Sequence, residues 1–273
     1  MIREMEGVAH LAMEQAGALI REKMGKISSS DIHTKGISDY VTQVDMESER
    51  IITGIIEKHF PRHHIMAEET ENDGMHEGFT WVIDPIDGTA NFIHGFPFVA
   101  ISIAVCENRE PILGFVLDPV RNECFTARKG GGAFLNGHPI QMRSTEDLGE
   151  TMIATGFPHR TRDIIDPYLE VFKRVFLQTS GIRRAGAAAL DLAYLAAGRV
   201  DGFWEAGLKA WDIAAGALLV HEAGGIVTDF WGEENYLENG HIVGGSSLTH
   251  PFLLEQVKTF LVPALASRAG VKK

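Results

Sequence analysis

Apolar residues near the start of the chain recur at intervals of three and four, which is the spacing of one helix face. The stripe consists of Met5, Val8, Ala9, Leu11, Ala12, Ala16, Leu19, Ile20 and Met24. It predicts an amphipathic helix that begins at Met5 and closes at Gly25. The same spacing predicts a second helix over residues 45–59, and the segment 35–45 is predicted to be a turn followed by a short extended piece.

Shorter apolar runs with the length of strands follow the second helix. The runs 98–105 and 112–117 flank a polar turn and predict a hairpin, and the run 123–128 predicts a further strand. We therefore expect the first half of the chain to form an antiparallel sheet beneath two helices.

The polar run 143–147 separates this part from a region of longer helices and strands. It predicts a boundary near residue 145, with residues 1–145 and 146–273 forming two halves that share one cleft. Helices in the second half are predicted over 167–176, 187–197 and 212–223. The expected fold class is α/β, a layered α+β sandwich in which helix layers and sheet layers alternate.

The composition is that of an ordinary globular protein. The chain has 273 residues, of which 45% are apolar and 23% are charged. No apolar run approaches the roughly 18 residues that a membrane-spanning helix needs. The first residues also lack the basic-then-apolar order of a signal peptide, so we expect a cytoplasmic protein with no membrane partner.

A formal net charge of −12 would repel the phosphate backbone of DNA or RNA and argues against a nucleic-acid partner. An anionic substrate would then be attracted by bound cations or local backbone amides. Cys106 and Cys124 lack the spacing of a structural zinc site and are predicted to be reduced core thiols. The histidines lack the spacing of a metal site, and the absence of a Gly-x-Ser-x-Gly motif argues against an acyl hydrolase.

Two carboxylates, Asp84 and Asp87, directly follow a strand-like apolar run. Pro85 cannot donate a hydrogen bond to a sheet, so we expect the strand to stop near Asp84. Gly88 permits a positive φ, and the amides from Gly88 and Thr89 onward can open a helix whose N-terminus attracts an anion. This corner of the chain is therefore predicted to hold hard cations next to a phosphate.

Further acids follow other apolar runs. Glu68 and Glu69 end one such run, and Asp212 enters a predicted helix. Each alone has a simpler explanation, since Asp212 fits a helix cap and Glu68 fits a solvated surface charge. Two carboxylates about 4 Å apart repel by about 4 kcal/mol at an effective dielectric constant of about 20, so a gathered set would need cations or protons. Together with Asp84 and Asp87, these acids point to a metal site.

Three segments of the chain resemble the inositol monophosphatase family, whose members are lithium-sensitive, magnesium-dependent phosphatases. The segments are Met66-Ala67-Glu68-Glu69, residues 81–89 from Trp81 to Thr89, and residues 211–216 from Trp211 to Gly216. The resemblance spans nearly the whole chain in the family's order, with two departures: Ala67, where members often carry glycine, and the alanines at 187 and 188, beside the substrate. It implies the layered sandwich of the sugar phosphatases, inhibition by lithium and a homodimer.

The resemblance also implies two to three magnesium ions. Glu68, Asp84 and the backbone carbonyl of Ile86 would hold one ion. Asp84, Asp87 and Asp212 would hold a second, and Glu68 with waters would hold a weaker third. Oxygen donors suit magnesium, whereas zinc is disfavoured because no His or Cys joins the set.

By the same resemblance, Thr89 and Asp45 would orient and deprotonate the attacking water, with Glu68 nearby. The amides of Gly88 and Thr89 would hold phosphate oxygens. Lys35 matches a lysine that lies close to the metal site in the family, and a solvated lysine is the alternative interpretation.

Substrate selection is expected from the second half of the chain. In the family, a glutamate at the place of Glu205 accepts hydrogen bonds from ring hydroxyls of inositol, and an exposed strand-end acid is the alternative interpretation. Gly186, Ala187 and Ala188 match the family segment that lines the inositol ring. Alanine there offers room and backbone groups but no hydroxyl.

The function that the resemblance implies is hydrolysis of inositol 1-phosphate by a magnesium-dependent phosphomonoesterase. Two alternatives keep the same chemistry: fructose 1,6-bisphosphatase activity, alone or as a second function, and hydrolysis of adenosine 3′,5′-bisphosphate. An alternative of another class is binding to transcription machinery, because some bacterial members of the family do so independently of turnover.

Overall fold

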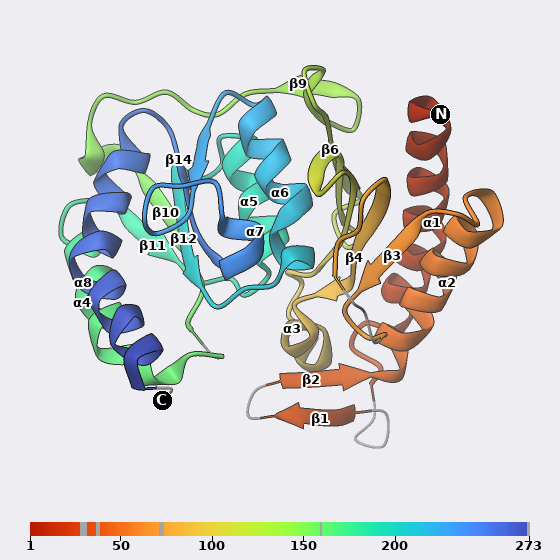
Figure 1. Ribbon diagram of the computed structural model, residues 1–273, viewed down its shortest axis with the longest axis horizontal. Helices are drawn as coiled ribbons and strands as arrows, with labels where there is room; N and C mark the ends of the chain where they lie inside the picture. The colour runs from red at the N-terminus through yellow and green to blue at the C-terminus, as the bar shows by residue number, and fades with distance from the viewer. Residues whose placement is uncertain (28–31, 37–38, 71–73, 159, 272–273) are drawn as a thin grey trace.

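The computed structural model describes residues 1–27, 32–36, 39–70, 74–158 and 160–271. Within them, helices and sheets alternate in layers: a helix pair, a seven-stranded sheet, a second helix pair, a five-stranded sheet and a third helix pair (Figure 1). This confirms the layered α/β sandwich expected from the sequence.

Helices α1 (Ile2–Lys23) and α2 (Gln43–His59) cover the outer face of the seven-stranded sheet. The predicted apolar stripe of α1 faces the sheet, but Leu11 is 39% exposed. It precedes the buried Ala12 by one residue, about 100° around the helix, and so falls outside the buried face, which instead includes Met13. Gly25 follows α1 with a φ of 71°, as its predicted place at the helix end requires.

The seven-stranded sheet has the strand order β3-β4-β5-β6-β7-β8-β9. Its strands are β3 (His64–Ala67), β4 (Phe79–Asp87), β5 (Ala100–Glu107), β6 (Glu110–Asp118), β7 (Glu123–Arg128), β8 (Gly132–Leu135) and β9 (His138–Ile140). The predicted hairpin is β5–β6, turned by Asn108 and Arg109 with positive φ. The prediction of a purely antiparallel sheet is wrong at one edge, because the chain crosses over after Ala67 and β4 pairs with β3 in parallel.

Helices α5 (Ala188–Ala196) and α6 (Ala210–Glu222) lie between the two sheets, close to the positions predicted for them. Both are buried on almost every side. Such an all-round apolar surface is what a helix needs when sheets cover it on opposite sides.

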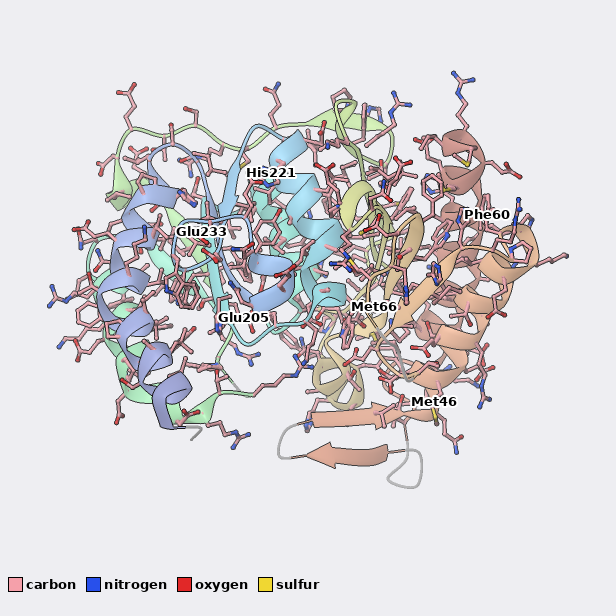
Figure 2. All side chains as sticks on the ribbon, in the orientation of Figure 1. Met46, Phe60, Met66, Glu205, His221 and Glu233 are labelled. Atoms are coloured by element: carbon pink, nitrogen blue, oxygen red, sulfur yellow. The ribbon has the colours of Figure 1, made fainter. Side chains whose placement is uncertain are left out.

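The five-stranded sheet has the order β11-β10-β12-β14-β13 and mixes parallel with antiparallel pairs. Its strands are β10 (Met152–Thr155), β11 (Gly181–Arg183), β12 (Gly202–Ala206), β13 (Ile226–Thr228) and β14 (His241–Gly245). Helices α4 (Ile165–Phe176) and α8 (Thr249–Val271) cover its outer face. Glu205 on β12 lies towards the middle of the molecule, whereas Phe60, after α2, lies at the opposite side from α8 (Figure 2).

Buried apolar side chains form clusters between the layers. On β4, Trp81 packs towards α1 and α2, and the next residue, Val82, packs into the central cluster with α5 and α6. On β12, Phe203 joins the central cluster and Trp204 packs towards α4 and α8. Each sheet therefore has both faces buried, because successive residues of a strand point to opposite sides.

The chain crosses from one sheet to the other between Ile140, where β9 ends, and Met152, where β10 begins. The predicted boundary at residue 145 falls in this crossing, and the division into halves 1–145 and 146–273 stays a prediction.

Two short strands, β1 (Ile32–Gly36) and β2 (Asp39–Thr42), form a separate antiparallel pair before α2. Lys35 belongs to β1, but its side chain lies outside the described part of the chain. The other short elements are α7 (Tyr236–Asn239) and the 3-10 turns Leu148–Glu150 and Arg162–Ile164. Among the helices that the structure describes, none has both the length and the hydropathy to cross a bilayer.

Both cysteines are free thiols, Cys106 buried and Cys124 half-buried. Burial raises the pKa of Cys106 to about 12 and that of Cys124 to about 11. Neither side chain therefore forms a reactive thiolate near neutral pH.

Candidate active site

Strand β4 brings Asp84 and Asp87 to the same face of the seven-stranded sheet. Asp84 pairs with Ser102 of β5 and Asp87 pairs with Ala100, so the two residues between the acids face a single residue of the partner strand. This is a β-bulge, and its extra residue reverses the alternation that would otherwise put the acids on opposite faces. The prediction that the strand stops near Asp84 is wrong, because the bulge accommodates Pro85 where no ladder hydrogen bond is required.

A left-handed glycine joins β4 to a short helix. Gly88 has a φ of 92°, and α3 (Thr89–His94) begins directly after it. The hydroxyl of Thr89 donates to Oδ1 of Asp45 at 2.9 Å. Asp45 is held in turn at the start of α2, where its Oδ2 accepts the backbone N–H of Thr42 at 2.8 Å in a capping box. The N-termini of α2 and α3 therefore meet at the Thr89–Asp45 pair.

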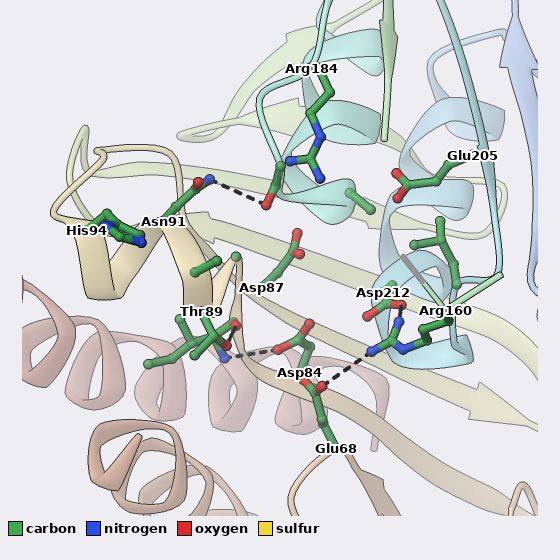
Figure 3. A pocket seen from close by; sticks show the side chains of 16 residues that line it. Glu68, Asp84, Asp87, Thr89, Asn91, His94, Arg160, Arg184, Glu205 and Asp212 are labelled. Carbon is green, nitrogen blue, oxygen red and sulfur yellow. Dashed lines mark hydrogen bonds and ion pairs between the residues drawn. The ribbon is translucent and has the colours of Figure 1, made fainter. Parts of the chain in front are cut away.

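The second half of the chain supplies Asp212 in the first turn of α6, as predicted. Its Oδ2 accepts the backbone N–H of Lys209 at 2.7 Å, which caps the helix. Arg160 lies between Asp212 and Glu68 (Figure 3). Its Nη1 is 3.4 Å from Oδ2 of Asp212, and its Nη2 is 3.8 Å from Oε1 of Glu68. One guanidinium thus bridges acids from the two halves.

These segments surround one cavity of about 420 Å³ between the two sheets. Its lining residues are Glu68, Asp84, Ile86, Asp87, Gly88, Thr89, Ala90, Asn91, His94, Arg160, Arg184, Gly186, Ala188, Glu205, Leu208 and Asp212. In Figure 3 the carboxylates of Asp84, Asp87 and Asp212 lie near one another, and Glu205 lies above Asp212 on the wall made by the second half.

Most residues singled out in the sequence line this cavity. They are Glu68, Asp84, Ile86, Asp87, Gly88, Thr89, Gly186, Ala188, Glu205 and Asp212. Asp45 stands behind Thr89, and Ala187 lies outside the lining, where it packs beside Gly88. Glu69 is not among the lining residues, and its backbone N–H donates to Oε2 of Glu49 at 2.8 Å. The side chain of Lys35 lies outside the described residues.

The electrostatics of the cavity favour the uncharged form of its acids. The pKa of Asp84 is raised well above its ordinary value, first by burial and then by the charges of Glu68, Asp87 and Asp212. Burial, and after it the charge of Asp212, raises the pKa of Asp87 to about 7. Backbone amides of α5 oppose that rise, and Ala189 donates to Oδ2 of Asp87 at 2.7 Å. Burial, and after it the repulsion among the acids, therefore favours their protonated form in the metal-free protein.

Two further acids, Glu205 on the cavity wall and Asp191 behind it, are buried in the second half of the chain. Burial raises the pKa of Glu205 to about 8. Asp191 on α5 is also buried, and its pKa is raised well above the ordinary value by burial and then by the charge of Glu205. Within the described residues, Oδ2 of Asp191 has no hydrogen-bond partner. No sequence pattern marks Asp191, since it occupies an ordinary position of a predicted helix.

The donor set fits magnesium, because it consists of carboxylates and the backbone carbonyl of Ile86. A divalent cation would also offset the burial and the repulsion that together raise the pKa of Asp84. Among the described residues, no three His, Cys, Asp or Glu side chains lie close enough together, as they stand, to bind one ion. Arg160 is itself the cation between Glu68 and Asp212, and it would have to move before an ion could reach both.

Sequence reasoning missed several polar residues of the cavity. Asn91 donates to the backbone oxygens of Phe98 at 2.7 Å and Ala185 at 2.9 Å, and so fixes the loop before α5. Arg160 and Arg184 project from loops that follow strands of the five-stranded sheet. Loop positions carry no periodic signal, and only the fold brings them to the cavity.

The raised pKa values predict how the stability of the metal-free protein depends on pH. Between the ordinary and the raised pKa, the folded state holds more protons than the unfolded chain, so stability falls as the pH rises. From about pH 6.5 to 8.5 the pKa values of about 7 for Asp87 and about 8 for Glu205 are crossed. Burial lowers the pKa of His221, so protonation of this histidine in the unfolded chain opposes the fall only at the lower end of the window, near its ordinary pKa of about 6.5. In EDTA, we expect the melting temperature to fall by about 5 °C or more across this window.

Magnesium should flatten this dependence, because it would take over the neutralising role of the protons. Thermal unfolding followed by circular dichroism, with and without magnesium, measures both effects. A metal-free melting temperature that stays constant or rises with pH would mean that these acids are not strained in the folded state.

Comparison with known proteins agrees with this arrangement. A sequence profile described as the inositol monophosphatase family matches residues 1–261. Nus factor SuhB of Pseudomonas aeruginosa is 46% identical, over 97% of this chain and 99% of that protein. An inositol-1-monophosphatase of Mesorhizobium japonicum is 41% identical, over 90% of this chain and 93% of that protein.

A solved structure shows the same architecture. The extragenic suppressor protein SuhB from Bartonella henselae matches with a TM-score of 0.89 and 39% identity, over 93% of this chain and 98% of that chain. The profile and these relatives each extend over nearly the whole sequence. This chain belongs to the inositol monophosphatase family.

Proposed function

We propose that this protein is a magnesium-dependent phosphomonoesterase that hydrolyses inositol 1-phosphate to inositol and phosphate. The observation that carries the proposal is the gathering of acids from separate segments around one cavity, beside the start of α3. Membership of the family supports a phosphatase, and the name of the Mesorhizobium relative supports the substrate.

Two to three magnesium ions would be held by the acids and the Ile86 carbonyl. Asp84 would bind two of the ions, one together with Glu68 and Ile86 and the other together with Asp87 and Asp212. When bound, magnesium would supply Lewis-acid stabilisation of the phosphoryl oxygens and lower the pKa of a water. The bulge at Pro85 supports this sharing, because it turns both acids of β4 towards α6.

The Thr89–Asp45 pair would orient the attacking water and accept its proton. Because the Thr89 hydroxyl donates to Asp45 at 2.9 Å, its oxygen lone pairs remain available to accept a hydrogen bond from water. Burial raises the pKa of Asp45, while hydrogen bonds from Thr42 and Thr89 oppose that rise. A buried carboxylate with a raised pKa is a better proton acceptor than an exposed one.

The substrate would lie across the cavity with its phosphate at the acids and its ring towards the second half. The amides of Gly88 and Thr89 would donate to phosphate oxygens at the start of α3. Glu205 would bind ring hydroxyls, and the loop 186–188 would contribute backbone groups and space. A pKa of about 8 lets Glu205 act as donor or acceptor near neutral pH.

A substrate panel tests the proposal. Purified protein would be assayed with inositol 1-phosphate, fructose 1,6-bisphosphate and adenosine 3′,5′-bisphosphate, each with magnesium and with EDTA. We expect kcat/KM to be at least about tenfold higher for inositol 1-phosphate, and no turnover in EDTA. A preference for either bisphosphate would select that alternative, and no turnover of any ester with magnesium would overturn the phosphatase.

The name Nus factor, carried by the Pseudomonas relative, favours a second role, the binding of transcription machinery. The net charge of −12 suits a basic partner surface. Binding of transcription complexes by wild type and by Asp84→Asn would separate the two roles, because an independent binding surface should survive the loss of turnover. Inhibition by lithium, the number of ions and the homodimer stay predictions of the same proposal.

A further inference from the structure

The carboxyl group of Glu205 rests directly on the backbone of Gly156. A Cβ added to Gly156 would overlap both carboxyl oxygens and Cδ of Glu205. The backbone of Gly156 is not in the left-handed region, so an alanine could adopt its conformation. The reason for glycine at this position is therefore the neighbouring carboxyl, and backbone strain plays no part.

The two backbones at this contact are locked together. Thr155 at the end of β10 pairs with Trp204 of β12 in parallel register, which puts Gly156 beside Glu205. The Thr155 hydroxyl donates to the Trp204 oxygen at 2.7 Å, and the Tyr168 hydroxyl donates to the Gly156 oxygen at 2.7 Å. Because Gly156 is held in this way, the Glu205 side chain would have to move if residue 156 carried a side chain.

No hydrogen bond or ion pair from the described residues fixes the Glu205 carboxyl. Its polar atoms face a cavity that it lines, although the residue as a whole is only 6% exposed. Packing against Gly156 therefore limits where the carboxyl can lie, the charges of Arg184 and Arg160 attract it, and its hydrogen-bonding capacity is left for a ligand.

We propose that Gly156 is a specificity-determining position, which seats the Glu205 carboxyl so that it can bind a hydroxyl of a polyol phosphate. The identity of the ligand rests on the proposed function. The positioning of the Glu205 carboxyl by Gly156, called the seat below, rests only on their contact. Gly156 is a positioning residue, since it would act through Glu205 and touch no reacting atom.

Gly156→Ala tests the proposal. It should lower kcat/KM for inositol 1-phosphate about tenfold or more, mainly through KM, because a misplaced partner loses its hydrogen bond to the substrate. Turnover of p-nitrophenyl phosphate, whose ring has no hydroxyl, should change less than about twofold. Gly54→Ala on α2 is the matched control, because a Cβ there would meet nothing within 4 Å.

Two further variants separate the seat from a general structural effect. In a Glu205→Ala background, Gly156→Ala should have no additional effect on kcat/KM, because the opposing carboxyl is gone. In the Gly156→Ala background, Glu205→Asp should restore part of the selectivity, since the shorter acid leaves room. Unchanged kinetics of Gly156→Ala, or an equal loss on both substrates, would overturn the specificity role.

Thermal stability tests the seat without any substrate. Gly156→Ala should lower the melting temperature by about 3 °C or more in the wild-type background and by less than about 1 °C in Glu205→Ala. Equal shifts in both backgrounds would overturn the steric contact. If the shifts in melting temperature differ between the two backgrounds while wild type does not turn over inositol 1-phosphate, Gly156 does position the Glu205 carboxyl, and the proposed substrate is wrong.

Discussion

Asp84→Asn should abolish turnover of inositol 1-phosphate, by a factor on the order of a thousand or more, in a folded protein. Apart from burial, the charges of Glu68, Asp87 and Asp212 raise the pKa of Asp84, so this acid interacts with the whole set. The amide keeps the shape and the acceptor for the Ile86 N–H at 3.0 Å, but it removes the charge that a divalent cation needs. Steady-state kinetics at saturating magnesium measure the loss.

The same variant should melt about 3 °C or more above wild type when both are metal-free, because a strained buried acid has been removed. Asp166→Asn, exposed in the first turn of α4, is the control: it should leave turnover unchanged and lower the melting temperature by no more than about 3 °C, because it removes a charge that favours the helix N-terminus. Wild-type turnover by Asp84→Asn would remove Asp84 from the proposed metal site. Lost turnover with a lower melting temperature would point to a damaged cavity instead.

Thr89→Ala should lower kcat by about 100- to 1000-fold, because the water would lose the group that orients it and passes its proton to Asp45. The Thr89 hydroxyl lies 2.9 Å from Oδ1 of Asp45 and 3.2 Å from the Ile86 oxygen, so it connects the base to the proposed metal corner. KM for inositol 1-phosphate should stay within about threefold, since the loss falls on the transition state.

Thr89→Ser is the control for this variant. Serine keeps the hydroxyl and should retain activity within about tenfold of wild type. Magnesium affinity from calorimetric titration should be similar in all three proteins. An alanine variant as fast as wild type would contradict the proton role, and weaker magnesium binding would show that Thr89 acts by holding the Ile86 carbonyl.

The sequence predicted the fold where the signal is local. The stripe of α1, the hairpin β5–β6 and the apolar helices α5 and α6 follow from periodicity and turn residues, and the structure confirms them. The sequence could not predict that β4 continues through Pro85, because a β-bulge depends on the register of the partner strand. The parallel pairing of β3 with β4 could not be predicted either, because it too depends on which strand is the partner.

The residues of the candidate site also fall into those that a local sequence pattern marks and those that it does not. Asp84, Asp87 and Asp212 stand in segments whose strand-to-turn and helix-entry patterns mark them, and the structure brings them to one cavity. No local pattern of this kind surrounds Arg160 or Gly156. Their roles arise only where the loop after β10 meets acids from other segments, and contacts between distant segments leave no trace in a single sequence.

Anomalous diffraction from crystals soaked in manganese would locate the bound ions directly, because manganese shares the preference of magnesium for oxygen donors. We predict at least two peaks inside the cavity, with Asp84 as a shared ligand and with the Arg160 guanidinium moved away from Asp212. A cavity without a peak at saturating manganese, or peaks confined to other parts of the molecule, would contradict the proposed metal site.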